Sequence, residues 1–379
     1  MLKNKIYKYL SGEIFKNFIT ILLTFTAIAW TVRAVNFLDL MVEDGYSMSI
    51  YFKYSVLNIT NIITRFIPLA FLVSLTISII KFERQKELLI LWTSGLSKIR
   101  IVNIFLLIAF FTTFLQILLS LFVNPFLLNK SRALMSNTET LQINSILKSN
   151  FFNDAFKGVT FYFDEKKANN ELINIFIKDV GGNLNTTIAE SSGSKNSTIF
   201  AKKGFINGNK LILFNGIMQN FNQKNKIQNI EFQRTEISLL NISTRTIKQP
   251  KIQETSSSIL LKCFFNPMGS LNLTNCSNKD YKGEVITTLS RRIGAPLYII
   301  LITLIVSLLL IHKKEKKKNF LKKYVLFFSS FIILVLTEIF LKYTGIYMSV
   351  AVTYFILPII VSIIFYNYLI KKIISEKIS

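Results

Sequence analysis

The chain has 379 residues, 51% of them hydrophobic, and a formal net charge of +24 at pH 7. So apolar a chain does not fit an ordinary soluble protein, whose surface must be covered by polar side chains. The charge does not indicate nucleic acid binding, because no zinc-finger, recognition-helix or RNA-binding motif accompanies it and the basic residues lie mostly beside apolar blocks.

Six apolar blocks are long enough, or nearly so, to cross a membrane, which takes about 20 helical residues for roughly 30 Å of hydrocarbon. The blocks are Ile14–Leu38, Tyr54–Ile80, Ile101–Phe122, Ile293–Ile311, Tyr324–Leu341 and Tyr347–Ile370. The first block is longer than a signal-peptide core and lacks a small-x-small cleavage site, so we expect a retained membrane anchor.

The charges predict the orientation of these helices. With six helices, four basic segments fall on one side of the membrane: Lys3–Lys8, Lys81–Arg100, His312–Lys318 and Lys371–Lys372. The short opposite loop, Asp39–Ser49, carries three acidic residues and no Lys or Arg. The positive-inside rule therefore places both termini in the cytoplasm and the long polar region on the outer side.

The polar region opens with a predicted helix over Leu127–Lys148. Short Ile-, Phe- and Thr-rich runs separated by Asn, Gly, Asp and Ser follow it, which predicts an antiparallel sandwich, jelly roll or barrel. The predicted strands are Gly158–Asp164, Leu172–Lys178, Thr186–Glu190, Thr198–Lys202, Lys210–Phe214 and Ile227–Ser238. We expect helices 1–3 in residues 1–124, an all-β domain in 125–288 and helices 4–6 in 289–379.

Two cysteines, Cys263 and Cys276, lie near the end of the polar region. In an oxidising compartment they can close one small disulfide loop, and two free thiols are the equally open alternative.

The sequence carries no recognisable catalytic centre. A phosphate-binding Gly-x4-Gly-Lys-Ser/Thr loop, a Gly-x-Ser-x-Gly elbow and metal-ligand spacing are all missing. The only histidine, His312, lies among lysines at the end of the fourth block and is expected to be solvated. We therefore expect no enzyme, cofactor or metal here, and any energy for work must come from another protein.

The cytoplasmic segment Lys81–Lys98 is expected to form a short amphipathic helix. Glu83 and Glu87 share one face, beside an apolar patch of Leu88, Leu91 and Trp92. Gly95 is suited to end the helix, and Ser97 to cap the next one. From the residues alone, docking into a partner protein and lying on the lipid surface both remain open.

This segment, with Glu87-Leu88 and Ser94-Gly95-Leu96-Ser97, resembles the cytoplasmic coupling segment of the LptF/LptG lipopolysaccharide export permeases. Pro68 and the stretch Leu289–Leu297, a basic pair followed by Pro-Leu, are also similar to that family. The layout of three helices, an outer β-domain and three helices is the family's layout over essentially the whole chain. The basic pair favours the LptF subunit.

The resemblance implies a bacterial inner-membrane permease subunit that extracts lipopolysaccharide and passes it to a periplasmic bridge. Family members pair as an F–G heterodimer on a dimer of the cytoplasmic ATPase LptB, and the membrane-anchored LptC associates with them. The ATP would be bound by that ATPase, which the segment would dock through Glu83, Glu87, Leu88, Leu91, Trp92 and Gly95. The implied β-domain is a jelly roll.

An acidic, multiply acylated glycolipid needs cations near the outer membrane face, above an apolar cavity. The candidates are Arg33, Lys53, Arg291, Arg292 and Lys342, of which Arg33 lies deepest within its block. The alternative is that these side chains snorkel to lipid headgroups. Glu338, inside the fifth block, is expected to pair with a cation or to be protonated within the bundle.

Three competing functions are compatible with a membrane protein of this kind. A lipoprotein-release or macrolide-type exporter subunit would have its outer domain after the first of four helices. A membrane-anchored scaffold or sensor would use the β-domain to bind a partner and would not associate with an ATPase. A secondary transporter would require broken helices with polar sites at the midplane.

Overall fold

The computed structural model describes residues 2–38, 47–139, 149–156, 158–167, 171–180, 196–207, 210–221, 227–238, 251–265, 279–311 and 316–378. The chain divides into two compact units, and each is treated separately below. The helical unit comprises Met1–Val32, Leu57–Asn129 and Lys251–Ser379, and the sheet unit comprises Arg33–Val56 and Lys130–Pro250.

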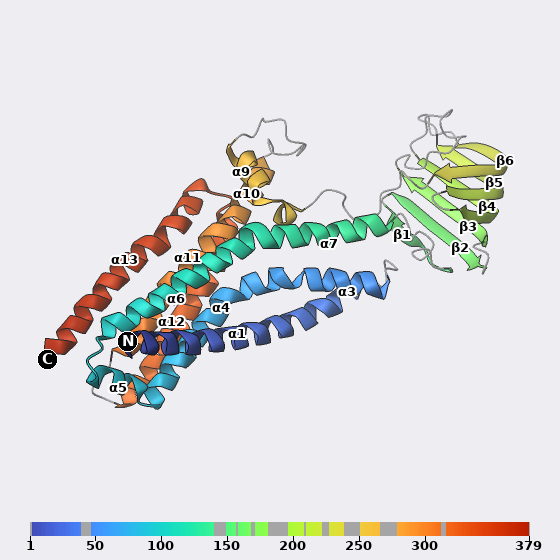
Figure 1. The fold of residues 1–379 in the computed structure, drawn as a ribbon. Coiled ribbons are helices and arrows are strands. Elements are labelled where there is room, and N and C mark those ends of the chain that lie inside the picture. Colours follow the sequence, from blue (N-terminus) through green and yellow to red (C-terminus); the bar gives the residue numbers. More distant parts are fainter. Residues whose placement is uncertain are drawn as a thin grey trace. The chain divides into compact units, whose positions relative to one another are not determined.

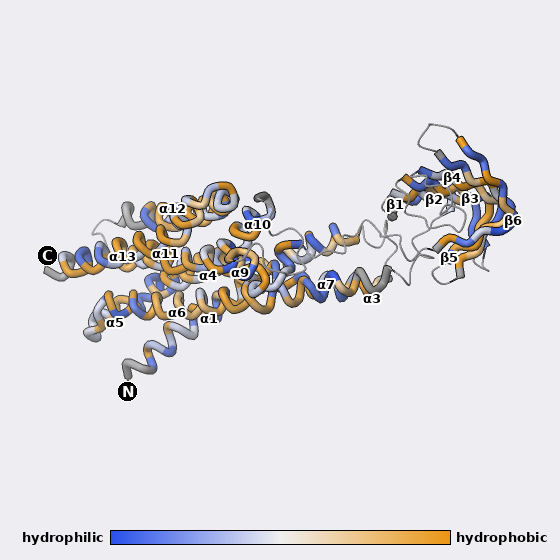
Figure 2. Tube along the Cα trace, turned by 90° about the horizontal axis from the view of Figure 1, so that it is seen from above, coloured by the Kyte–Doolittle hydropathy of each residue, from blue (hydrophilic) through white to orange (hydrophobic). Residues whose placement is uncertain are grey.

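Six helices in the described part of the chain are long and apolar enough to cross a membrane, as the sequence predicted. These spans are Lys5–Asn36, Met48–Arg84, Lys98–Leu134, Tyr281–Leu310, Leu321–Tyr343 and Met348–Ser375. Figure 2 shows the apolar residues running along these helices. Three spans precede the β-strands and three follow them, which rules out the one-helix-then-domain layout of the competing exporters.

The long helices are α1 (Leu2–Asn36), α3 (Met48–Leu57), α4 (Ile59–Arg84), α6 (Lys98–Leu118), α7 (Asn124–Glu139), α10 (Lys279–Leu289), α11 (Ala295–Ser307), α12 (Lys316–Tyr343) and α13 (Met348–Ile378). Shorter helices are α5 (Glu87–Thr93), α9 (Ser257–Phe265) and the 3₁₀ turns η3 (Ile252–Glu254) and η5 (Leu308–Leu310). The predicted helix Leu127–Lys148 corresponds to α7, and its residues 140–148 lie outside the described part.

Helix α11 is the centre of the helical unit, where it packs against α4, α6, α12 and α13 (Figure 1). Its most apolar window is 72% buried, whereas the windows of α1, α12 and α13 are 11–22% buried. The core joins Ile299 and Ile302 of α11 to Phe71 and Leu75 of α4. The outer helices therefore present apolar side chains away from this core, as lipid-facing or partner-facing helices do.

Two π-helical turns interrupt the membrane helices and lie next to each other. One, η1 (Leu119–Val123), joins α6 to α7, and the other, η4 (Ser290–Gly294), joins α10 to α11. The hydroxyl of Ser120 in η1 donates a 2.8 Å hydrogen bond to the backbone oxygen of Arg292 in η4. π-Turns leave backbone groups without regular helical partners, and here a side chain supplies one.

The described strands of the sheet unit form one six-stranded antiparallel sheet in the order β1-β2-β3-β4-β5-β6. The strands are β1 (Asn153–Phe156), β2 (Val159–Lys166), β3 (Glu171–Val180), β4 (Asn196–Asn207), β5 (Lys210–Phe221) and β6 (Ile227–Ser238). An inserted all-β domain is thus confirmed, and the strand order, which the sequence left open, is sequential. The described strands lie in one meander.

One face of the sheet carries a continuous apolar core. Phe161, Ile177, Ile199 and Met218 are cross-strand partners and are almost fully buried. Gly216 is required within this sheet, because a Cβ there would lie 2.5 Å from the ring of Phe232. The strand β1 was missed by the sequence prediction, and the predicted strand Thr186–Glu190 lies outside the described residues.

The last strand, β6, carries charges that interact across to β5. Arg234 and Lys210 donate hydrogen bonds of 2.9 and 3.4 Å to Glu236. These bonds favour the ionised carboxylate and lower the pKa of Glu236 below its ordinary value. Charged side chains of this kind help to keep an edge strand soluble.

Candidate functional site

The segment between α4 and α6 is broken into two parts. Helix α4 continues to Arg84, so Glu83 belongs to a membrane helix, and α5 begins at Glu87. Lys86 between them adopts a left-handed conformation with φ of 60°, which a right-handed helix cannot include. The single coupling helix expected over residues 81–97 is therefore wrong, because this break separates Glu83 from Glu87.

The end of α5 follows the sequence prediction. Gly95 has φ of 85°, and its N–H donates to the backbone oxygen of Trp92. The N–H of Leu96 donates to the backbone oxygen of Leu91, which completes a Schellman motif. Ser97 is extended and precedes α6 directly.

The two faces of α5 have different surroundings. Leu88 is only 2% exposed, and Leu91 and Trp92 pack partly against the core of the helical unit. Leu89 and Ile90 are 56% and 62% exposed. The expected docking patch of Leu88, Leu91 and Trp92 is therefore turned largely toward the chain's own core, and the face open to a partner is Leu89, Ile90 and Thr93.

The two carboxylates of the segment are held by the chain itself. The hydroxyl of Tyr9 in α1 donates a 3.0 Å hydrogen bond to Oε1 of Glu87. Lys323 in α12 forms a 2.8 Å ion pair with Glu83, and Lys81 in α4 pairs with Glu13 in α1. These contacts anchor α5 and the end of α4 to α1 and α12, and no local sequence pattern predicted them.

A surface groove of about 350 Å³ lies between α1 and α5. Its walls are apolar apart from Lys5 and the Tyr9–Glu87 pair, and its lining residues are Lys5, Ile6, Tyr9, Leu10, Glu87, Ile90 and Leu91. On the other flank of α5, the Lys98 ammonium lies 4.6 Å from the centre of the Trp92 ring, a cation–π distance. Helix α5 therefore has one face packed against the core, at Leu88, and one accessible apolar face, at Leu89 and Ile90.

The candidate lipid-binding cations differ in accessibility. Arg292 is 5% exposed and donates to Ser257 Oγ at 2.6 Å and to the backbone oxygens of Gln253 and Thr255 at 3.0 and 2.9 Å. Ser257 in turn donates to the backbone oxygen of Leu121 at 2.7 Å. A guanidinium so enclosed cannot reach a lipid phosphate, so the structure assigns Arg292 to fixing the segment 251–257 on the start of α11.

Arg291, the neighbouring residue, is accessible. Its side chain is 35% exposed and donates to Glu338 of α12 over 3.4 Å. This contact identifies the cation that the intramembrane Glu338 was expected to need. Lys342 lies one turn further along α12 and is exposed.

The other two candidate cations belong to the sheet unit. Arg33 lies in the last turn of α1 and is half-buried, and Lys53 of α3 is exposed. Near them the hydroxyl of Tyr51 donates to the backbone oxygen of Ala34 at 2.9 Å, which holds α3 against the end of α1. Both cations are available to a ligand.

Cys263 is buried in α9 and takes part in a disulfide bond. Cys276, the other cysteine of the chain, lies outside the described residues. Among the residues that the structure describes, no three His, Cys, Asp or Glu side chains gather as a metal site.

Comparison with known proteins places the chain in context. A family model described as "Lipopolysaccharide export system permease LptF/LptG" matches residues 8–372. An uncharacterized protein of Rickettsia prowazekii (strain Madrid E) is 22% identical over 295 residues, which cover 77% of each chain.

Proposed function

Because the chain belongs to the LptF/LptG family of lipopolysaccharide export system permeases, we propose that it extracts lipopolysaccharide from the inner membrane with energy from a separate ATPase. The chain is a multi-pass membrane protein of a transport system.

The ATPase is proposed to dock on α5. The observation that carries this is the division of α5 into a buried face, at Leu88, and an exposed apolar face, at Leu89 and Ile90. A short helix that exposes apolar side chains below a membrane domain is suited to a groove on a protein partner. Its buried face gives the helix a firm base, so a partner's movement would shift the membrane helices and not only the loop.

The polar contacts indicate which helices such a movement would displace. Glu87 connects α5 to α1 through Tyr9, and Glu83 connects α4 to α12 through Lys323. Closure of the ATPase dimer would therefore move α1, α4 and α12 together. In this cycle the movement narrows an apolar cavity between two permease subunits and expels the lipid outward.

The outer end is proposed to bind and receive the lipid. Among the candidate cations, Arg33, Lys53 and Lys342 are each proposed to contact its phosphates, whereas Arg291 is paired with Glu338 and Arg292 is enclosed. The sheet unit would face the periplasm, where it receives the lipid and its edge strand β6 pairs with a partner's strand. Both termini would then be cytoplasmic.

The expected partners are a paralogous permease subunit resembling LptG, an ATPase resembling LptB and a membrane-anchored protein resembling LptC. The basic pair before Pro296 favours an LptF-like role for this chain. No cofactor is proposed for the chain itself, since ATP would be bound by the ATPase.

Co-expression with the candidate ATPase of the same genome, followed by purification of the chain, tests the proposal. Co-elution that is lost in the Ile90→Asp variant would support a permease docked through α5. A well-folded chain that fails to co-elute would support the alternative of a membrane-anchored scaffold, for which the partner of the β-domain becomes the question.

A further inference from the structure

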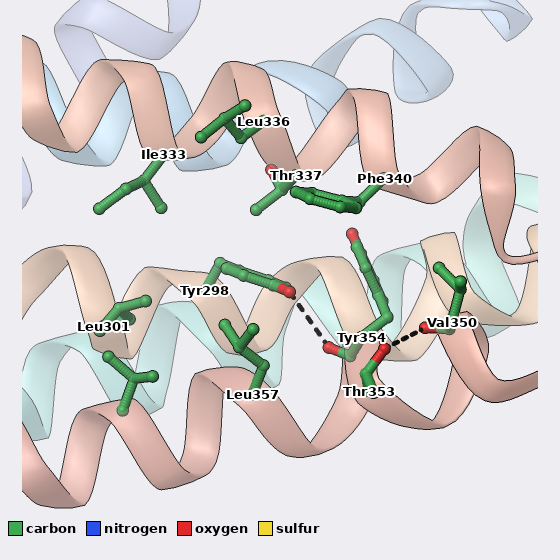
Figure 3. A pocket seen from close by; sticks show the side chains of 11 residues that line it. Tyr298, Leu301, Ile333, Leu336, Thr337, Phe340, Val350, Thr353, Tyr354 and Leu357 are labelled. Atoms are coloured by element: carbon green, nitrogen blue, oxygen red, sulfur yellow. Dashed lines mark hydrogen bonds between the residues drawn. The ribbon is translucent and has the colours of Figure 1, made fainter.

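A second cavity, of about 310 Å³, lies among α11, α12 and α13, away from the cytoplasmic segment. It is lined by Tyr298, Leu301, Ile333, Leu336, Thr337, Phe340, Val350, Thr353, Tyr354, Leu357 and Val361 (Figure 3). At its mouth Leu336, Phe340 and Leu357 are 43–54% exposed, so the slot opens on the apolar outer surface of these helices.

Three side-chain hydroxyls in the walls are bonded within the chain. The hydroxyl of Tyr298 donates to the backbone oxygen of Tyr354 at 3.2 Å, and Thr337 and Thr353 donate to backbone oxygens of their own helices. Figure 3 shows two of these bonds pointing away from the gap. The hydroxyl of Tyr354 points into the gap (Figure 3), and the rest of the lining is mostly apolar.

The length of the slot matches one leaflet of a membrane. Its lining on α13 runs from Val350 to Val361, which is ~16 Å of helix at 1.5 Å per residue. The hydrocarbon of a bilayer is about 30 Å thick, so the slot reaches about halfway across it. It begins close to the turn between α12 and α13, where Tyr343 ends one helix and Met348 starts the next.

Two opposite charges lie at that same end. Glu338 follows the lining residue Thr337 in α12, and Arg291 donates to it over 3.4 Å, a long contact that leaves both groups partly exposed. Both charges are near enough to interact electrostatically with Tyr354 in the slot. The ring of Tyr354 lies against Gly294, where a Cβ would come within 2.9 Å of it.

We propose that this slot binds one acyl chain of a glycerophospholipid whose headgroup joins a phosphate to an amine, with the phosphate at Arg291 and the ammonium at Glu338. The lipid is a resident of the permease and not its cargo. A neutral pair of charges complements a zwitterionic headgroup. The phosphates of lipopolysaccharide would meet the carboxylate of Glu338, and its several acyl chains exceed one slot.

Native mass spectrometry of the full chain, purified in complex with its partners, tests this site. The complex is titrated with phosphatidylethanolamine and, separately, with phosphatidylglycerol of the same acyl chains. We expect one phosphatidylethanolamine to bind, with an affinity about threefold above that of phosphatidylglycerol, the size of one exposed charge contact. Equal affinities in the wild type would overturn the headgroup assignment.

The variants separate the slot from the surrounding surface. Leu336→Trp fills the slot and should abolish this binding, whereas Ile332→Trp, one turn away on the exposed side of α12, should not. Glu338→Lys should reverse the preference toward phosphatidylglycerol, and Arg291→Gln should weaken both lipids. Unchanged binding in Leu336→Trp would exclude the slot.

Two further outcomes would also contradict the proposal. Displacement of the phosphatidylethanolamine by purified lipopolysaccharide would make the slot part of the cargo site. Binding of phosphatidylethanolamine to the chain alone, but not to the complex, would mean that a helix of a partner protein occupies the slot in the complex. The Leu336→Trp variant should still co-elute with the ATPase. A wrong assignment of the lipid slot can therefore be distinguished from a wrong transport function.

Discussion

The hydroxyl of Tyr9 donates a 3.0 Å hydrogen bond to Glu87, which joins the N-terminal helix α1 to the first residue of α5. Glu87 is therefore a residue that positions α5 within its own chain before any partner arrives. Together with the Lys81–Glu13 and Lys323–Glu83 ion pairs, this hydrogen bond connects α5 and the C-terminal end of α4 to α1 and α12.

If Glu87 acts through Tyr9, loss of either side chain should have the same effect. We expect Tyr9→Phe to weaken binding of the ATPase about two- to tenfold, the range of one hydrogen bond to a charged group near the surface. Glu87→Gln should do likewise, and the double variant should be little worse than either single variant. Affinities for the ATPase, measured with the wild type, the two single variants and the double variant, give the coupling energy between Tyr9 and Glu87. Strictly additive losses of affinity would mean that Glu87 contacts the ATPase directly.

The exposed face of α5 should carry the docking energy. Ile90→Asp places a charge in the expected apolar contact and should abolish co-purification of the ATPase, because an unpaired charge at the centre of an interface is costly. Ser97→Asp adds the same charge to the same segment at a position where Asp is a good helix cap, and it should leave binding intact. Equal loss in both variants would point to a general charge effect.

Arg292 should matter for stability more than for lipid binding. Arg292→Met leaves the backbone oxygens of Gln253 and Thr255 without their buried donor, at a cost of about 2–5 kcal/mol. Arg291→Gln breaks a partly exposed ion pair worth about 0–1 kcal/mol. Thermal unfolding of the two purified variants should show a clearly lower midpoint for Arg292→Met, and equal midpoints would contradict the structural role.

The disulfide of Cys263 should close on Cys276, the one other cysteine in the sequence. A cross-link over so short a loop stabilises by about 3 kcal/mol in the chain-entropy model. Without reductant, the purified protein should resist alkylation and yield one cross-linked peptide pair on mapping. Two alkylated thiols in protein isolated under oxidising conditions would exclude the bond, and with it the simplest sign that this segment faces the periplasm.

The layout of the fold was predictable because it depends on composition over long windows. Six apolar spans and a β-rich insertion follow from the length and spacing of the apolar blocks, as at Tyr324–Leu341 within α12. The strand β1 was missed because it has only four residues, too few for an alternating pattern to show.

The orientation of α5 was not predictable, because it depends on contacts from distant parts of the chain. Leu88 and Ile90 are equally apolar in the sequence, and only packing against the core separates them. The left-handed Lys86 gave no local signal, since lysine has no preference for that conformation.

The burial of Arg292 was also not predictable, because it too depends on contacts from a distant part of the chain. A basic pair at the start of an apolar helix predicts two interfacial cations. The return segment 251–257 covers one of them and leaves the other exposed, and the covering residues are some 35 positions away. The sequence therefore located the cations without revealing which of them a lipid could reach.

The proposed function requires that this chain moves lipopolysaccharide with energy that an ATPase delivers through α5. The most direct test is ATP-dependent release of lipopolysaccharide from proteoliposomes that contain the chain, its paralogue and the ATPase. We expect release that requires ATP and is lost in Ile90→Asp while the protein still inserts. Release without the ATPase, or full release by the Ile90→Asp complex, would contradict the account.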